Sequence, residues 1–95
     1  MKMILMHPGE YIIEVYLKPL NMGVTDLANR LKVSKSTVSR IINQKADVTP
    51  SMALKLSYVL GRSAESWMSM QTSYSLHREI KTFSSKGLKR ITETN

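Results

Sequence analysis

The sequence contains no cysteine, and its uninterrupted apolar stretches are all short. Without cysteine, neither a disulfide framework nor a thiolate metal site can form. A membrane-spanning helix needs about 20 consecutive apolar residues, so no span is expected. The apolar start at residues 1–6 is interrupted by His-Pro-Gly-Glu at residues 7–10 before it reaches the length of a signal peptide. These absences favour a cytoplasmic protein without a membrane partner.

Acidic side chains are scarce, because 7 Asp and Glu stand against 14 Lys and Arg, a net charge of +7 over 95 residues. Such an excess favours polyanionic partners, nucleic acid before anionic membrane. A basic surface that only keeps the protein soluble is the alternative. Two segments hold most of the excess: residues 24–45 contain five bases and one acid, and residues 81–95 contain four bases and one acid.

Groupings typical of catalysis or metal binding are also missing. His7 and His77 lie far apart in the sequence, and no cluster of acids accompanies either of them. Glu10 and Glu14 lie one helical turn apart, but no nucleophile or base accompanies them. The sequence therefore predicts that the protein is not an enzyme and holds no metal or cofactor.

The sequence predicts an all-α fold of five short helices, because no stretch alternates apolar and polar residues for long enough to form a strand. His7 and Pro8 are typical of a helix start, and Lys18-Pro19 is expected to end that first helix. The other predicted helices are Val24–Leu31, a third from a cap at Ser34 to about Asn43, a fourth from Thr49-Pro50 to Gly61, and a fifth that begins after Ser63.

In the fifth helix, an aromatic and methionine stripe favours core packing over a dimer seam, although one stripe can serve both. The stripe consists of Trp67, Met70 and Tyr74, and Leu76 and Ile80 are further candidates for it. After Phe83 no core pattern continues. We therefore expect one folded domain over residues 1–83 and a loosely ordered basic tail over residues 84–95.

The stretch from Val24 to Asn43 has the apolar pattern of a helix-turn-helix, in which two short helices meet across a turn of three or four residues. Ala28 is small enough to let the two helices approach closely, and Val33 can fill the turn. The remaining apolar positions of the motif are Leu27, Leu31, Val38 and Ile41. An ordinary helical hairpin would need the same apolar set.

The polar side of the second helix distinguishes the two interpretations. Its residues are Ser34, Lys35, Ser36, Ser39, Arg40 and Asn43. None of them is acidic, and their hydroxyls, cations and amide can form hydrogen bonds with base edges or phosphates. The pattern therefore predicts that this helix reads DNA in the major groove.

These segments resemble a known family. Residues 24–43, VTDLANRLKVSKSTVSRIIN, resemble the repressor-type helix-turn-helix of the Cro/C1 (XRE) class. The longer stretch from His7 to about Tyr74 is similar to the HigA/VapI antitoxin family, through HPGE, LKPL, MALKLSYVLG and SAESWMSMQ. The resemblance implies a lambda-repressor-like domain that binds double-stranded DNA as a homodimer, at a palindromic operator in its own promoter. It also implies a HigB-like ribonuclease toxin as a further partner.

The resemblance also implies roles for individual residues. The candidates for base contact are Ser36, Ser39 and Arg40, with Lys35 and Asn43 at either end of the set. A bidentate bond from Arg40 to guanine would contribute about 1–3 kcal/mol of discrimination. The candidates for phosphate contact are Thr25 at the start of the second helix, Ser34, and Lys45 in the loop after the third helix.

The sequence departs from the family pattern at two places. Lys32 occupies the turn position that usually holds glycine, and a left-handed backbone there would cost on the order of 1 kcal/mol. Where relatives often carry an aromatic-acidic-leucine run, this chain has Tyr74-Ser75-Leu76.

Three functional hypotheses remain at this point. The polar face and the local charge favour a sequence-specific autorepressor. The apolar residues 3–6 and the resemblance favour a module that neutralises a toxin, with DNA binding secondary. The third hypothesis is a solitary regulator without a toxin.

Overall fold

A computed structural model describes residues 5–91, and all the regular structure in that part of the chain is helical. The first helix covers residues 8–20 as three contiguous parts, α1 (Pro8–Ile12), η1 (Ile13–Leu17) and α2 (Lys18–Leu20). It is followed by α3 (Val24–Leu31), α4 (Lys35–Ile42), α5 (Pro50–Leu60) and α6 (Ala64–Ile80). The predicted all-α fold of five helices is confirmed. No helix in residues 5–91 is long and apolar enough to cross a membrane.

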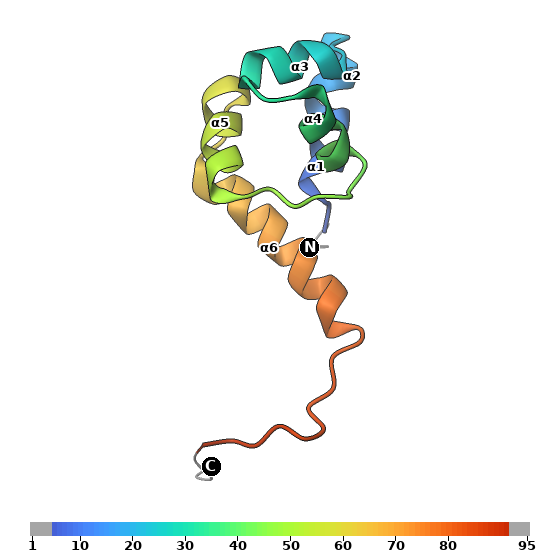
Figure 1. Cartoon of the computed structure of the whole chain (residues 1–95), viewed down its shortest axis with the longest axis vertical. Coiled ribbons are helices and arrows are strands. Elements are labelled where there is room, and N and C mark those ends of the chain that lie inside the picture. Colours follow the sequence, from blue (N-terminus) through green and yellow to red (C-terminus); the bar gives the residue numbers. More distant parts are fainter. Residues whose placement is uncertain (1–4, 92–95) are drawn as a thin grey trace.

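The helices α1, α3, α4 and α5 form one cluster, and α6 begins against it and then extends away toward the C-terminus (Figure 1). The centre of the core is Trp67 of α6, which is fully buried and donates its indole N–H to the Gly61 carbonyl at 2.9 Å. Tyr11 packs edge-on against the Trp67 ring at 5.7 Å. The predicted core role is thus confirmed for Trp67, and Met70 packs against the core, whereas Tyr74 is half-buried against His7. Leu76 and Ile80 point away from the core and are 57% and 61% exposed.

Side-chain caps begin four of the five helices, at the residues that the sequence predicts. In each case a side chain accepts a backbone N–H that the helix leaves without a partner. The pairs are His7 with Gly9 (2.9 Å), Ser34 with Thr37 (3.1 Å), Thr49 with Met52 (3.2 Å) and Ser63 with Ser66 (3.0 Å).

The first helix does not end at Lys18-Pro19, so this prediction is wrong. The backbone of η1 is wider than an α-helix, and the Lys18 N–H bonds the Ile13 carbonyl five residues back. A proline inside an α-helix normally clashes with the carbonyl four residues earlier. The wider turn before Pro19 accommodates the ring, and the helix continues to Leu20 before Asn21 adopts the left-handed conformation at φ 52°.

The part of the predicted tail that the structure describes, residues 84–91, contains no helix, and every residue in it is exposed. It runs away from the helical cluster (Figure 1). The remaining residues, 92–95, lie outside the described part of the chain, as do residues 3 and 4 of the apolar start. That the tail is loosely ordered stays a prediction.

Gly9 allows the start of α1 to pack against the end of α4. A Cβ atom at this position would lie 2.0 Å from the Ile41 carbonyl oxygen, which belongs to the backbone and cannot turn aside. The glycine of the HPGE segment is therefore a steric requirement of the α1–α4 contact.

Gly9→Ala should lower the free energy of unfolding by about 2–3 kcal/mol, because one of two backbones has to move. Chemical denaturation followed by circular dichroism measures this change. Gly23→Ala is the control, since a Cβ there meets nothing within 4 Å, and it should cost less than about 1 kcal/mol. Equal losses for the two variants would contradict the steric explanation.

His7 should make the stability of the protein depend on pH. Burial lowers the pKa of its imidazole from 6.5, and the nearby Asp47 carboxylate only partly opposes this effect. The ring is 1% exposed and packs edge-on against Tyr74 at 5.0 Å, and its buried Nε2 has no hydrogen-bond partner among the described residues 5–91. Because the unfolded chain binds the proton more readily, stability is complete above pH 6.5 and is lost as the pH falls below that value.

Thermal unfolding at pH 7.5 and pH 5.5 tests this dependence. The wild-type protein should lose more stability over this interval than His7→Asn, which keeps a capping side chain but has no ionisable group. Parallel losses in the two proteins would show that His7 is not the group responsible.

Candidate nucleic-acid interface

α3 and α4 are held together by the apolar residues that the sequence assigns to the helix-turn-helix. Leu27, Ala28 and Leu31 of α3 are 0–3% exposed, and Val38 and Ile41 of α4 are 2% and 5% exposed. Val33, in the turn between the helices, is half-buried against this core. This packing turns one side of α4 inward and leaves its other side on the surface.

The turn between the two helices has a left-handed residue at Lys32, with φ 59° and ψ 43°. The Lys32 N–H bonds the Asn29 carbonyl at 3.2 Å, and the Val33 N–H bonds the Ala28 carbonyl at 3.1 Å. These two bonds form a Schellman motif, which normally places glycine at the left-handed position. The strain expected for a lysine at this position is therefore present.

The five residues expected to contact bases lie on the outward side of α4 or at its end. Lys35, Ser36, Arg40 and Asn43 are exposed, and Ser39 is half-buried. Residues 36, 39, 40 and 43 are separated by three or four positions, so they form one face of the helix. The structure therefore brings the predicted set together.

A pair of hydrogen bonds restricts what Asn43 and Ser39 can offer to a ligand. The Asn43 amide group donates to the Ser39 carbonyl at 2.9 Å and to the Ser39 hydroxyl at 3.3 Å. The amide nitrogen is thereby engaged with its own helix. The Asn43 amide oxygen remains as an acceptor, and the Ser39 hydroxyl hydrogen remains as a donor.

The cations of this surface are available to a ligand. Within residues 5–91, Lys35, Arg40 and Lys45 form no ion pair, whereas Arg30 in the last turn of α3 is bonded to Asp26 at 3.1 Å. The sequence between Asp26 and Asp47 contains no acidic residue. The exposed side of α4 therefore combines free positive charge with hydroxyl groups.

The three candidates for phosphate contact differ in their surroundings. Thr25 is exposed in the first turn of α3, where the cap residue Gly23 provides no side-chain bond to the free N–H groups. Lys45 is exposed in the loop after α4, and its own N–H bonds the Arg40 carbonyl at 2.7 Å. The Ser34 hydroxyl is already engaged, because it accepts the Thr37 N–H and lies 2.8 Å from the Thr37 hydroxyl.

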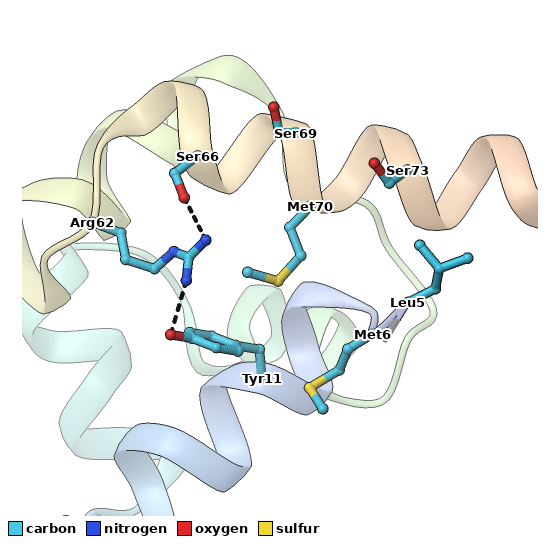
Figure 2. A pocket seen from close by; sticks show the side chains of 8 residues that line it. All are labelled: Leu5, Met6, Tyr11, Arg62, Ser66, Ser69, Met70 and Ser73. Atoms are coloured by element: carbon cyan, nitrogen blue, oxygen red, sulfur yellow. Dashed lines mark hydrogen bonds between the residues drawn. The ribbon is translucent and has the colours of Figure 1, made fainter. Parts of the chain in front are cut away.

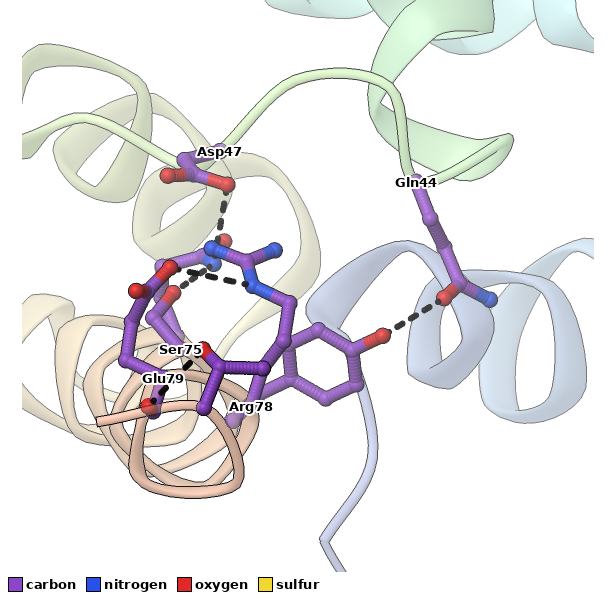
Figure 3. Close-up of polar contacts among 8 residues, drawn as sticks. Gln44, Asp47, Ser75, Arg78 and Glu79 are labelled. Atoms are coloured by element: carbon purple, nitrogen blue, oxygen red, sulfur yellow. Dashed lines mark hydrogen bonds and ion pairs between the residues drawn. The ribbon is translucent and has the colours of Figure 1, made fainter. Parts of the chain in front are cut away.

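Sequence reasoning missed the buried Gln71, which fixes the loop after α4. Its carbonyl oxygen accepts the Val48 N–H at 2.8 Å, and its amide group donates to Asp47 and Ser75 at 3.2 Å and 3.0 Å. Nearby, the Tyr74 hydroxyl donates to Gln44 at 3.2 Å, so α6 holds both ends of the loop (Figure 3). The only signal in the sequence was a polar residue at a core-facing position of the Trp67 stripe.

The family model for the helix-turn-helix matches residues 13–67, which include α3, α4 and the whole of α5. The chain belongs to the helix-turn-helix family. Within it, the regulator is a member of the Cro/C1 (XRE) class, a class of DNA-binding transcription regulators and antitoxins and not of enzymes.

Two curated relatives show how far the similarity extends. The regulator is 38% identical over 84 residues to the HTH-type transcriptional regulator YddM of Escherichia coli, and the alignment covers 88% of each chain. It is 41% identical over 70 residues to virulence-associated protein I of Dichelobacter nodosus, and this alignment covers 74% of this chain and 65% of that protein.

Solved structures agree with this assignment. The antitoxin GraA superposes with a TM-score of 0.85 at 29% identity, over 95% of this chain and 100% of that one. The antitoxin HigA of Pseudomonas aeruginosa, solved with the higBA promoter, superposes with a TM-score of 0.81 at 30% identity, over 95% of this chain and 97% of that one.

Lys32→Gly should raise the free energy of unfolding by about 1 kcal/mol, because glycine adopts the left-handed conformation without strain. Denaturant titration measures the difference. Lys32→Ala is the control, since it removes the same charge but keeps a Cβ, and it should not stabilise the protein. If the alanine variant gains as much as the glycine variant, charge and not backbone strain is the cause.

Proposed function

We propose that the regulator is an operator-specific repressor that acts as a homodimer in the cytoplasm and is the antitoxin of a HigB/HigA-type pair, repressing its own operon. The observation that carries the proposal is the outward face of α4, where Lys35 and Arg40 are exposed beside the hydroxyls of Ser36 and Ser39 and form no ion pair with any residue of 5–91. Such a face suits a major groove, which presents base edges between two rows of phosphates.

In this proposal α4 lies in the major groove and its side chains have separate tasks. Arg40 forms two bonds with the O6 and N7 atoms of a guanine. The hydroxyls of Ser36 and Ser39 and the free amide oxygen of Asn43 bond neighbouring base edges. Lys35 at the start of α4 contributes to the choice of base through its positive charge and its long side chain.

Phosphate contacts then fix the position of α4 along the duplex. The open N-terminus of α3 with Thr25 bonds a phosphate through its free N–H groups, and Lys45 neutralises another on the far side. Ser34 contributes to this surface chiefly by keeping α4 capped. Two copies reading a palindrome would place their α4 helices about 34–36 Å apart, or at a multiple of that spacing.

The antitoxin part of the proposal is supported by the relatives. GraA and HigA are both described as antitoxins, and HigA was solved with the higBA promoter. The alternative is a solitary regulator without a toxin, which is supported by the match to YddM, a protein named as a transcriptional regulator, over 88% of both chains.

Fluorescence anisotropy with the DNA upstream of its own gene and a scrambled duplex tests the DNA-binding part. The protein should prefer the native duplex, and Arg40→Ala should reduce that preference by roughly 5- to 150-fold, which corresponds to 1–3 kcal/mol. Lys45→Ala should instead weaken binding to both duplexes alike. It should also reduce the slope of the logarithm of the binding constant against the logarithm of the salt concentration by about 1.

Arg78→Ala is the matched control, because it removes an arginine from α6 and should leave the preference unchanged. Equal binding of native and scrambled duplexes by the wild-type protein would contradict operator recognition. For the antitoxin part, a neighbouring short reading frame that arrests growth alone but not with the regulator would support the pair, and its absence would leave the solitary regulator.

A further inference from the structure

A basic and apolar surface lies where the C-terminal end of α3 meets the second half of α5 (Figure 1). Three cations, Arg30, Lys32 and Lys55, line a groove of about 340 Å³ there together with Leu54 and Tyr58. None of the described residues that line this groove is acidic, and none belongs to α4. We call it the α3–α5 surface.

The apolar part of this surface is exposed to an unusual degree. Tyr58 is 92% exposed and Leu54 is 65% exposed, so within residues 5–91 no other element covers either side chain. The two residues are four positions apart, which places them on one side of α5. Tyrosine is enriched where proteins bind other proteins, because its ring provides contact area and its hydroxyl a hydrogen bond.

The strained backbone at Lys32 belongs to the same surface. Glycine would adopt the left-handed conformation of this turn without strain, yet the chain has a lysine there, and its side chain lines the groove. Strained residues of this kind cluster at functional sites. Lys32 is not among the residues assigned to bases or phosphates, so its strain favours a separate role for its charge.

The positive charge of the surface is only partly neutralised. Within residues 5–91, Lys32 and Lys55 form no ion pair, and Arg30 is bonded to Asp26 through its Nε atom at 3.1 Å. The Arg30–Asp26 pair is exposed, and such pairs hold their members weakly. The surface therefore offers cations on the rim of an apolar groove.

The groove between α1 and α6 is a weaker candidate for a binding site. Arg62, the cation that lines it, bonds the hydroxyls of Tyr11 and Ser66, as Figure 2 shows. Its guanidinium also lies over the Tyr11 ring at 4.8 Å. The charge in this groove is thus engaged within the chain, whereas the charge of the α3–α5 surface is available.

We propose that the α3–α5 surface docks a segment of another protein in which acidic residues flank one large apolar side chain. The apolar side chain lies in the groove against Leu54 and Tyr58. The carboxylates pair with Lys32 and Lys55 and, at the edge, with Arg30. The partner is acidic because complementary charge both attracts it and excludes basic competitors.

Two other occupants fit the surface less well. A second copy of this chain in a two-fold contact would bring the same three cations close to one another, which is unfavourable. Single-stranded nucleic acid binds by stacking successive bases on several aromatic rings. Tyr58 is the one aromatic residue among those that line the groove, and its neighbours Leu54 and Val59 are aliphatic.

The inference goes beyond the proposed function, since it adds a protein partner that operator recognition does not require. The α3–α5 surface shares no residue with the proposed base and phosphate contacts. An acidic partner could therefore be held while α4 occupies the major groove.

Selection from a display library of short random peptides, made without DNA, tests the chemistry of the partner. Peptides retained by the wild-type protein and not by Tyr58→Ala should contain two or more Asp or Glu around a leucine or an aromatic residue. Absence of such enrichment, or enriched peptides without acidic residues, would overturn the proposal. Binding of an oligo(dT) strand that Tyr58→Ala abolishes would also overturn it, in favour of single-stranded nucleic acid.

A synthetic peptide with the selected sequence then tests the site by fluorescence anisotropy. Tyr58→Ala should weaken its binding at least about 10-fold, while Phe83→Ala, which removes an exposed aromatic ring elsewhere, should leave it unchanged. Lys32→Gly should weaken binding about 3-fold although it stabilises the fold, so unfolding cannot explain the loss. Equal binding by Lys32→Gly and the wild type, or equal losses in Tyr58→Ala and Phe83→Ala, would contradict the proposed site. Because no DNA is present, these results are independent of operator recognition.

Discussion

The DNA-reading surface depends on the buried contact between α3 and α4. Leu27 and Ala28 pack against Val38 and Ile41, and this contact determines which side of α4 reaches the solvent. Once these apolar residues are buried, the hydroxyls and cations between them can only point outward, because successive helical residues are rotated by about 100°. The order of polar and apolar residues in α4 thus produces an exposed surface that consists of hydroxyls and cations.

Both ends of α4 are held by the backbone and by distant residues. Left-handed residues, Lys32 before the helix and Gln44 after it, allow the chain to bond the last carbonyls of α3 and α4. Gln71 and Tyr74 of α6 then fix the loop that follows. A reading helix fixed in this way loses little conformational entropy when it binds, which favours specific recognition. The left-handed backbone at Lys32 is strained, and the lysine at this position places one more cation beside the motif.

The local features of the fold could be predicted from the sequence because their causes are local. A capping hydroxyl or imidazole followed by proline or a polar first turn marks a helix start wherever it occurs, and the spacing around Ala28 marks the motif. Pro19 was misjudged because the widened turn that accommodates it depends on how the first helix packs. Gln71 was missed because its partners are 23 and 24 residues away. Leu76 was wrongly kept as a candidate for the Trp67 stripe, because nine residues at about 100° each place it on the opposite side of α6.

The central claim, that α4 reads base edges in the major groove, is tested most directly by methylation interference on duplexes selected by the protein from a random library. Methylation of guanine N7 blocks the major-groove atoms that Arg40 is proposed to bond. The account predicts interference at guanines in two half-sites one helical turn apart, or a multiple of it, and loss of interference at one guanine per half-site in Arg40→Ala. Interference that is unchanged in Arg40→Ala, or confined to minor-groove positions, would contradict it.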